Sequence, residues 1–208
     1  MNWIVFFDID GTLTRGVTSG AYLARLLGHE RTMKEAEEAY ERGELDNNEV
    51  CRIDAAGYAG HTTAELFGML EGMPLVNGVA QAVEAIHTAG GEAHIASLAW
   101  DVVGAYLCEQ YGFDGFVGSK LEMKDGVYTG EVSCALEAED KCAYARELCV
   151  TRGIDLAECV AIGDSRSDIQ LFELVGTSIA FNATEEARRV ATHVYCGADI
   201  ADALALAR

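Results

Sequence analysis

Residues 3–12 read WIVFFDIDGT, and this stretch decides the fold. Its first five residues are all aromatic or β-branched, a pattern that predicts a short buried strand. Asp8, Asp10, Gly11 and Thr12 follow at once, so carboxylates and a tight turn stand where that strand ends. In an open parallel sheet, ligands bind beyond the carboxyl ends of the strands. The stretch therefore predicts a central strand and the place of a functional site.

The rest of the chain supplies further strands for such a sheet. We expect strands at EAHIAS (92–97), FDGFV (113–117), CVAI (159–162), SIAF (178–181) and HVY (193–195). The phrase KLEMKDGVYTGEV (120–132) predicts a hairpin that turns at Asp125-Gly126. Helical patterns lie between most of these strands. Strands that alternate with helices predict an α/β fold with a doubly wound parallel sheet.

An acidic, helical block interrupts the first crossover of this sheet. Helical patterns run from about residue 14 to Pro74, the only proline of the chain. We therefore expect a catalytic core made of residues 1–14 and 76–208, and a small helical cap made of residues 15–75. The hinges of the cap should lie near residues 14–16 and 74–78.

Composition excludes several classes of protein. Lys and Arg number 15 against 34 Asp and Glu, a formal net charge of -19, which argues against a nucleic-acid or anionic-membrane surface. The seven cysteines include no Cys-x-x-Cys pair, so we expect neither a zinc site nor a disulfide framework. This cysteine usage is typical of a reduced, cytoplasmic protein. No apolar run approaches the ~20 residues of a membrane span.

Polar residues follow three of the predicted strands at the same edge of the sheet. Asp8 and Asp10 follow the first strand, Ser97 follows HIA, and GDSRSD (163–168) follows CVAI. A lone Asp after a strand is usually a turn residue or a helix cap. Several carboxylates that converge repel one another unless a cation joins them, and oxygen ligands without His or Cys favour Mg²⁺ or Ca²⁺. The joint placement therefore predicts a metal-dependent site.

The same edge has features suited to a phosphate group. Gly11 and Gly163 allow the backbone amides to approach an anion closely. Lys141, near the start of the helix that precedes CVAI, is the best candidate for the positive partner. Alone, each would be an ordinary turn residue or solvated helix charge. Together they favour a site for a phosphorylated small molecule.

These motifs resemble the haloacid dehalogenase superfamily and, within it, the phosphoserine phosphatase-like group. DIDGT (8–12) is similar to the first motif of the family, Ser97 to the second, Lys141 to the third and GDSRSD (163–168) to the fourth. The phrases KDGVYTGEV and SIAFNA also resemble that group. The helical block 15–75 is similar to its small cap.

The resemblance implies a chemical role for each carboxylate. Asp8 would be the nucleophile that attacks phosphorus and forms an aspartyl-phosphate. Asp10 would protonate the leaving alcohol and then serve as the base for the hydrolytic water. The carboxylates of Asp8 and Asp164 and the backbone carbonyl of Asp10 would hold Mg²⁺.

The resemblance also implies a phosphate-binding set. Ser97, the backbone N–H of Leu98, and Lys141 would bind the transferring phosphoryl group. This arrangement supplies the positioning and charge neutralisation that phosphoryl transfer requires. Supporting positions would be Gly11, Thr12, Gly163, Ser167 and Asp168.

The resemblance is partial in the cap. Arg52 matches an arginine that binds the substrate carboxylate in phosphoserine phosphatases. The glutamate that holds the substrate amine in that group falls at Val17 here, and the Gly-Gly that follows the serine of the second motif is replaced by Leu98-Ala99. These departures leave phosphoserine as one candidate substrate.

The sequence thus predicts a Mg²⁺-dependent hydrolase of a small phosphorylated metabolite. The substrate could be phosphoserine or another small ester, such as a sugar, polyol or histidinol phosphate. Two non-enzymatic alternatives are a phosphate- or metal-binding protein without turnover, and a protein that binds a partner through the acidic cap. Monomer and homodimer are equally open.

Overall fold

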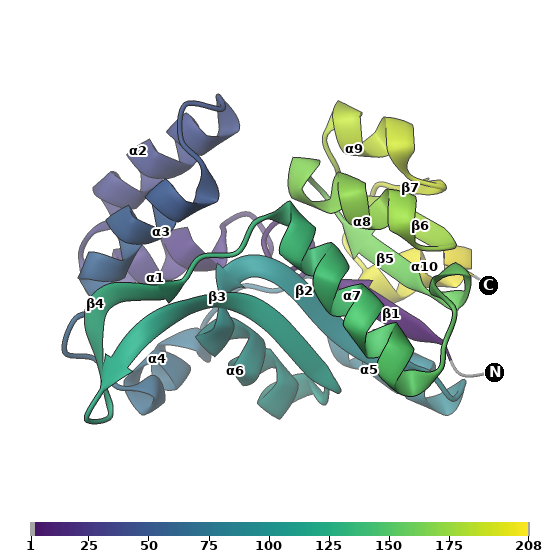
Figure 1. The fold of residues 1–208 in the computed structure, drawn as a ribbon, viewed down its shortest axis with the longest axis horizontal. Coiled ribbons are helices and arrows are strands. Elements are labelled where there is room, and N and C mark those ends of the chain that lie inside the picture. The colour runs from purple at the N-terminus through teal and green to yellow at the C-terminus, as the bar shows by residue number, and fades with distance from the viewer. Residues whose placement is uncertain (1–2, 208) are drawn as a thin grey trace.

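The strand predicted at WIVFF forms the centre of a seven-stranded sheet. In the computed structural model, which describes residues 3–207, the strand order is β4-β3-β2-β1-β5-β6-β7 (Figure 1). Only the β3–β4 pair is antiparallel among the described strands, which confirms the α/β fold class. The strands are β1 (Ile4–Phe7), β2 (Glu92–Trp100), β3 (Gly115–Lys124), β4 (Val127–Cys134), β5 (Val160–Gly163), β6 (Thr177–Phe181) and β7 (His193–Tyr195).

Helices cover both faces of the sheet, because alternate residues of a strand point to opposite faces. Val5 and Phe7 pack on the face covered by α5, α6 and α10, whereas Ile4 and Phe6 face α7, α8 and α9. The helices are α1 (Ser19–Leu27), α2 (Glu30–Glu41), α3 (Asn47–Ala55), α4 (Thr63–Leu70), α5 (Val79–Thr88), α6 (Asp101–Tyr111), α7 (Ala138–Arg152), α8 (Ile169–Leu174), α9 (Glu185–Val190) and α10 (Ile200–Leu204). None of the helices within residues 3–207 combines the length and apolar character needed to cross a bilayer.

The strand predicted at FDGFV (113–117) is continuous with the first strand of the predicted hairpin. We expected two separate strands there, but β3 runs without interruption from Gly115 to Lys124. The predicted hairpin turn is confirmed, since Asp125 and Gly126 have φ angles of 51° and 83°. Trp100 ends β2, and α6 begins at the next residue. The β2–β3 register is irregular between Ala96 and Trp100, so the chain departs from regular pairing around Ser97.

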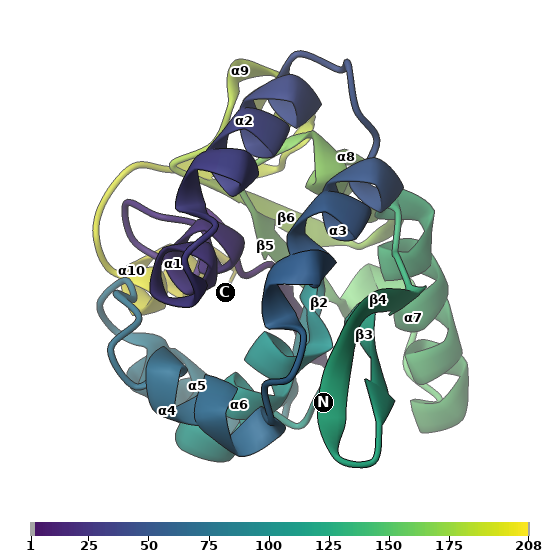
Figure 2. The same cartoon turned by 90° about the vertical axis from the view of Figure 1, so that its left-hand side faces the viewer.

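The helical block leaves and rejoins the core at one point. Thr14 and Leu75 form an isolated antiparallel bridge, and the amide of Val76 donates to the carbonyl of Leu13 at 2.9 Å. Between these ends, α2 and α3 stand above the sheet, whereas α1 and α4 lie lower against the core (Figure 1, Figure 2). The boundaries of a cap at residues 15–75 stay a prediction.

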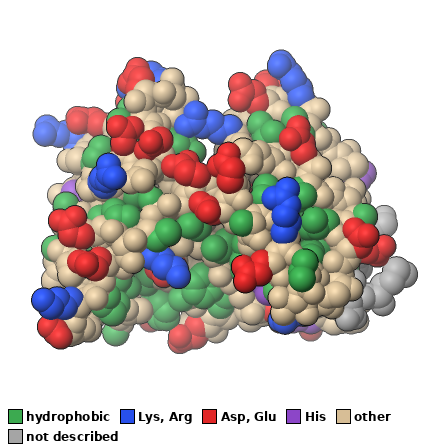
Figure 3. Space-filling model, in the orientation of Figure 1, with side chains coloured by type: hydrophobic (Ala, Val, Ile, Leu, Met, Phe, Trp, Pro, Cys, Tyr) green, Lys and Arg blue, Asp and Glu red, His purple; other side chains and the backbone are tan. Residues whose placement is uncertain are grey.

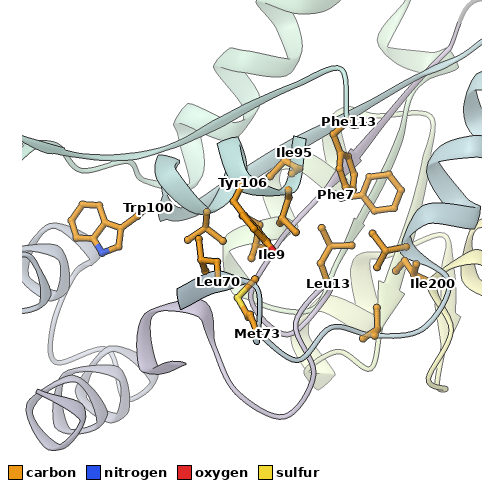
Figure 4. Packing of buried hydrophobic residues seen from close by; sticks show 14 of the residues in the cluster. Phe7, Ile9, Leu13, Leu70, Met73, Ile95, Trp100, Tyr106, Phe113 and Ile200 are labelled. Atoms are coloured by element: carbon orange, nitrogen blue, oxygen red, sulfur yellow. The ribbon is translucent and has the colours of Figure 1, made fainter. Parts of the chain in front are cut away.

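The loop after β1 is anchored by apolar side chains that alternate with its carboxylates. Ile9 and Leu13 are buried beside Phe7, Leu70 and Met73 (Figure 4). Because Ile9 enters this core, Asp8 and Asp10 on either side of it are directed toward the site. The core on this face therefore fixes the position of the first motif.

We expect Phe7→Ala to lower the free energy of unfolding by about 3–5 kcal/mol, because a fully buried ring is removed from the main core. The ring also makes an edge contact with Phe113 at a centroid distance of 5.5 Å. The matched control is Val150→Ala, since Val150 is 83% exposed and should change stability by less than about 0.5 kcal/mol. Urea unfolding with an unchanged m value measures both. Equal losses in the two variants would contradict this packing.

Candidate active site

A fully buried ammonium group lies at the centre of the site. Lys141 reaches from the first turn of α7, and its Nζ donates to Asp8 Oδ1 at 2.8 Å, Asp168 Oδ1 at 2.8 Å and Ser167 Oγ at 3.1 Å. These partners come from the end of β1 and from the loop after β5. Three segments far apart in sequence therefore meet at one nitrogen.

Asp168 organises the loop that follows β5. Its second oxygen, Oδ2, accepts the backbone amides of Asp164 and Ser165, each at 3.1 Å. Both oxygens of Asp168 are thus occupied by protein donors. The supporting role implied for Asp168 agrees with this geometry.

Asp8 and Asp164 form the part of the acidic cluster that is open to a cation. Carboxylate oxygens of Asp8, Asp164 and Asp168 lie within 4.8 Å of one another. Asp168 is saturated by hydrogen bonds, whereas Oδ2 of Asp8 accepts none from the described residues. All the donors are hard oxygen atoms, a set that suits Mg²⁺.

Two glycines allow this approach. A Cβ on Gly11, whose φ is +80°, would lie 2.3 Å from Asp164 Oδ2, and a Cβ on Gly163 would lie 2.3 Å from the carboxyl carbon of Asp168. Thr12 is fully buried and its hydroxyl donates to Asp164 Oδ1 at 3.5 Å. The turn after β1 and the loop after β5 therefore pack directly against each other.

Asp10 is held by the start of α1. Its carboxylate accepts the amide of Ser19 at 2.5 Å and the hydroxyl of Ser19 at 3.1 Å. Ser19 was missed by the sequence analysis. Its signal is the N-capping Thr18 just before it, which places free amides at the start of a helix.

The second motif lies where β2 departs from regular pairing. Ser97 is buried, and its Oγ accepts the amide of Ala99 at 3.2 Å. Ser97 and Leu98 both line the same cavity as Asp8 and Asp10. The carbonyl of Leu98 is held by the hydroxyl of Ser119 at 2.7 Å.

Burial and mutual repulsion change the acidity of the carboxylates. Burial, above all, raises the pKa of Asp8 to about 7 and that of Asp164 to about 8, and repulsion from neighbouring carboxylates, Asp168 among them, raises both further. Burial also raises the pKa of Asp10 to about 6, although the bonds from Ser19 oppose this. Burial lowers the pKa of Lys141, but Asp168 and Asp8 outweigh it and the net shift is upward. The ammonium is therefore retained, and it does not neutralise every carboxylate around it.

The cavity beyond these residues has a volume of about 260 Å³ and lies between the sheet edge and the helices α1, α2 and α3. From the core it is lined by the motif residues already described. From the helical block it is lined chiefly by side chains of α2 and α3. Among the latter are Met33, Glu37, Tyr40, Glu41, Asn47, Val50, Cys51 and Asp54.

Arg52 does not reach this cavity. It is exposed on α3 and is absent from the cavity lining, so its expected contact with a substrate carboxylate has no support in this geometry. Asp54, two residues further on, faces inward instead. Residues two apart on a helix are rotated by about 200°, so one buried side chain excludes the other. Val17, where phosphoserine phosphatases have a glutamate that holds the substrate amine, packs against the core and does not line the cavity.

Two acidic residues of the cavity were missed by the sequence analysis. Glu37 accepts a hydrogen bond from the hydroxyl of Thr18, and Asp54 accepts Trp100 Nε1 and His29 Nε2, each at 2.6 Å. The signal for Glu37 was its helical spacing from Met33, four residues earlier, and from Tyr40. Those apolar residues mark the inward face of α2.

Two further contacts join the helical block to the core. Arg166, in the loop after β5, stacks over the ring of Tyr40 at 4.1 Å and donates to the Tyr40 carbonyl at 2.8 Å. Asn47 Nδ2 donates to the carbonyl of Leu136 at 2.7 Å. The block is therefore seated over the motif residues.

The fold and the four motif segments define a hydrolase class. The family model for haloacid dehalogenase-like hydrolases matches residues 5–173, and the chain belongs to this family. The match runs from β1 to α8 and contains every motif of the site.

Two similar proteins in this family have a more specific name, phosphoserine phosphatase. The chain is 28% identical over 189 residues to phosphoserine phosphatase SerB2 of Mycobacterium tuberculosis, covering 90% of this chain and 46% of the relative. It is 26% identical over 204 residues to phosphoserine phosphatase of Haemophilus influenzae, covering 98% of this chain and 65% of the relative. The chain thus spans about half to two thirds of the length of these relatives.

Solved structures share the fold over the whole chain. A structure titled as a phospho-aspartyl intermediate analogue of phosphoserine phosphatase has a TM-score of 0.85 at 23% identity, covering 98% of this chain and 97% of its own. A HAD family hydrolase of Salmonella enterica serovar Typhi has a TM-score of 0.84 at 25% identity, covering 93% of this chain and 67% of its own. The resemblance to the family and to its phosphoserine phosphatases is confirmed.

The raised pKa values predict how stability depends on pH and Mg²⁺. Because the folded-state pKa values of Asp8 and Asp164 exceed the ordinary value, metal-free protein loses stability as pH rises through about 7 to 8. Asp164→Asn should remove part of this loss, so its melting temperature relative to wild type should rise between the ordinary pKa of 3.8 and about pH 8 and level off above that. Mg²⁺ should raise the melting temperature of wild type more at about pH 8 than at pH 6, and should have little effect on the variant. Thermal unfolding with EDTA or Mg²⁺ measures this. A Mg²⁺ effect that persists in Asp164→Asn would contradict the assignment.

Proposed function

We propose that this chain is a Mg²⁺-dependent phosphomonoester hydrolase that works through a phosphorylated Asp8 and acts on a small metabolite. The observation that carries the proposal is the Lys141 centre, where the nucleophile of the family motif is held by a buried ammonium at 2.8 Å. Membership of the haloacid dehalogenase-like family and the similarity to phosphoserine phosphatases support it.

Asp8 is proposed as the nucleophile. The Asp8 carboxylate has Oδ1 beside Lys141 and Oδ2 without a donor among the described residues, so one oxygen would join Mg²⁺ while the other attacks phosphorus. The bond between that oxygen and phosphorus forms as the bond between phosphorus and the ester oxygen breaks. Water then attacks the same phosphorus, releases inorganic phosphate and restores the Asp8 carboxylate.

Asp10 is proposed as the proton donor and acceptor. Its pKa of about 6 allows it to hold a proton near neutral pH and then to give it up. The proton would pass to the leaving alcohol oxygen in the first step and would return from the attacking water in the second. The bonds from Ser19 fix the carboxylate for both transfers.

Charge on the phosphoryl group is to be balanced from two sides. Lys141 and the hydroxyl of Ser97 are placed to bind phosphoryl oxygens, with a backbone amide from Leu98. Mg²⁺, when bound by Asp8, Asp164 and the Asp10 carbonyl, would neutralise negative charge on the reacting group. This distribution also accounts for how an acidic protein accepts an anionic substrate.

The identity of the substrate is a separate question from the class of reaction. The names of the relatives give phosphoserine as one candidate. Arg52 does not line the cavity, so the cation expected for the carboxylate of phosphoserine is missing there. Other small esters, including sugar, polyol and histidinol phosphates, therefore stay candidates. The two non-enzymatic alternatives gain no specific support, since Asp8 and Asp10 are both placed in the cavity.

Replacing the nucleophile should abolish turnover. We expect Asp8→Asn to lower Mg²⁺-dependent phosphate release from p-nitrophenyl phosphate and from a panel of small esters by at least about 10³-fold, because the amide cannot form the phosphorylated enzyme. The matched control is Asp125→Asn at the hairpin turn, where φ is 51° and Asn is well tolerated. Its activity should equal that of wild type. Substantial turnover by Asp8→Asn would overturn the mechanism.

Replacing the proton donor should separate substrates by leaving group. Asp10→Asn should lower kcat about 10²–10³-fold for an alkyl phosphate, but far less for p-nitrophenyl phosphate, whose leaving group needs no proton. With wild type, kcat for the alkyl ester should fall as pH rises above about 6, while that for the aryl ester falls less. Steady-state kinetics across pH measures this. Equal losses on both esters would show that Asp10 does not donate the proton.

A further inference from the structure

The helical side of the active-site cavity is negatively charged and lacks a cation. Among residues 3–207, six of those that line the cavity are Asp or Glu, and none is Lys, Arg or His. Asp8, Asp10 and Asp164 belong to the phosphoryl end. The other three, Glu37, Glu41 and Asp54, come from α2 and α3. Figure 3 shows acidic side chains spread over this face of the molecule, including around the notch between its two upper lobes.

Glu37 lies directly beside the proposed proton donor. Thr18 donates to Glu37, and the next residue, Ser19, donates to Asp10. The two carboxylates are thus held by adjacent residues at the start of one helix. A group attached to the leaving oxygen would extend from Asp10 toward Glu37.

Gly20 allows Met33 and the inward carboxylates to lie close to the start of α1. A Cβ at this position would lie 2.9 Å from Met33 Cε, 3.9 Å from Glu37 Oε1 and 4.0 Å from Asp54 Oδ2. A larger residue would therefore displace the Met33 methyl group at this part of the cavity lining. Gly20, Met33, Glu37 and Asp54 thus form one wall of the cavity.

The neighbouring cations are engaged elsewhere. Lys141 is fully buried on its own carboxylates, and Arg166 is stacked on Tyr40 and lines a separate surface hollow. His29 is paired with Asp54 and does not line the cavity. A carboxylate on the leaving group would therefore meet only like charge there.

We propose that the substrate is the phosphate ester of an amino alcohol, with an ammonium group and no carboxylate, and that Glu37 receives the ammonium. This inference rests on the proposed function and narrows its substrate. A cation one or two bonds beyond the ester carbon would be attracted by Glu37, with Glu41 adding to the field, whereas Asp54 is paired with His29 and Trp100. A neutral polyol would leave Glu37, which is partly buried, with Thr18 as its hydrogen-bond donor and no countercharge.

The test uses four esters of similar size that differ in charge. Phosphoethanolamine carries an ammonium, propyl phosphate carries no charge beyond the phosphate, phosphoglycolate carries a carboxylate, and phosphoserine carries both groups. We expect kcat/KM for phosphoethanolamine to exceed that of each of the other three by about tenfold or more. An equal or higher value for phosphoserine would overturn the proposal.

Substitution of Glu37 tests whether this residue binds the ammonium group of the substrate. Glu37→Gln should lower kcat/KM for phosphoethanolamine about tenfold, mainly through KM, and should reduce its advantage over propyl phosphate to about twofold or less. The matched control is Glu35→Gln on the exposed face of α2, which should keep the wild-type ratio. An unchanged ratio in Glu37→Gln would show that Glu37 is not the ammonium site. The ranking by wild type does not depend on how well the variant folds.

A binding measurement separates this inference from the proposed function. Calorimetric titration of the four esters into Asp8→Asn with Mg²⁺ reports affinity without turnover, and the expected order again has phosphoethanolamine first. If wild type released no phosphate from any ester, including p-nitrophenyl phosphate, the hydrolase proposal would fail. Tighter binding of phosphoserine or phosphoglycolate than of phosphoethanolamine would refute the charge preference by itself.

Discussion

The buried ammonium of Lys141 is the constraint on which the rest of the site depends. An ammonium that is fully withdrawn from water is tolerated only when charged and polar partners surround it, and removing one partner of such a buried pair typically costs about 3–5 kcal/mol. Asp8, Ser167 and Asp168 are those partners. They come from β1 and from the loop after β5, while the lysine comes from α7. The order of the sheet, with β1 directly beside β5, is what brings them together. Asp168 also fixes the loop after β5, because it accepts hydrogen bonds from two backbone amides of that loop.

One ammonium group does not neutralise all the carboxylates at this edge of the sheet. Asp8, Asp164 and Asp168 crowd within 4.8 Å, and burial together with repulsion raises the pKa of the first two. The proposed Mg²⁺ would offset that excess charge, because a divalent cation joins carboxylates that otherwise oppose one another. The two ends of the cavity then differ in kind. At the sheet edge, a lysine and a metal can balance a phosphoryl group, whereas at the helical end Glu37 and Asp54 face a space with no lining cation. One cavity thus suits an anion at one end and a cation at the other.

Much of this site could be predicted from sequence because a parallel sheet places its strand ends at one edge. Asp8, Asp164 and Asp168 follow apolar strands, and their convergence requires only the topology. The extent of β3 could not be predicted in this way. It passes through Gly118 and Ser119, weak strand formers that are held because β3 pairs first with β2 and then with β4. The inward face of the helical wall could not be predicted for a related reason. Which face of α3 turns inward depends on docking against Trp100, and that docking turns Asp54 in and leaves Arg52 out.

The proposed mechanism requires Asp8 to carry the phosphoryl group during turnover. The most direct test is to quench the enzyme during turnover of a hydrolysed ester with Mg²⁺, reduce it with borohydride, and sequence its peptides by mass spectrometry. Borohydride converts an aspartyl-phosphate to homoserine. We expect homoserine at position 8 in the sample with Mg²⁺ and ester, and none when EDTA replaces the metal. Sustained phosphate release with an unmodified residue 8, or with the modification at another carboxylate, would contradict it.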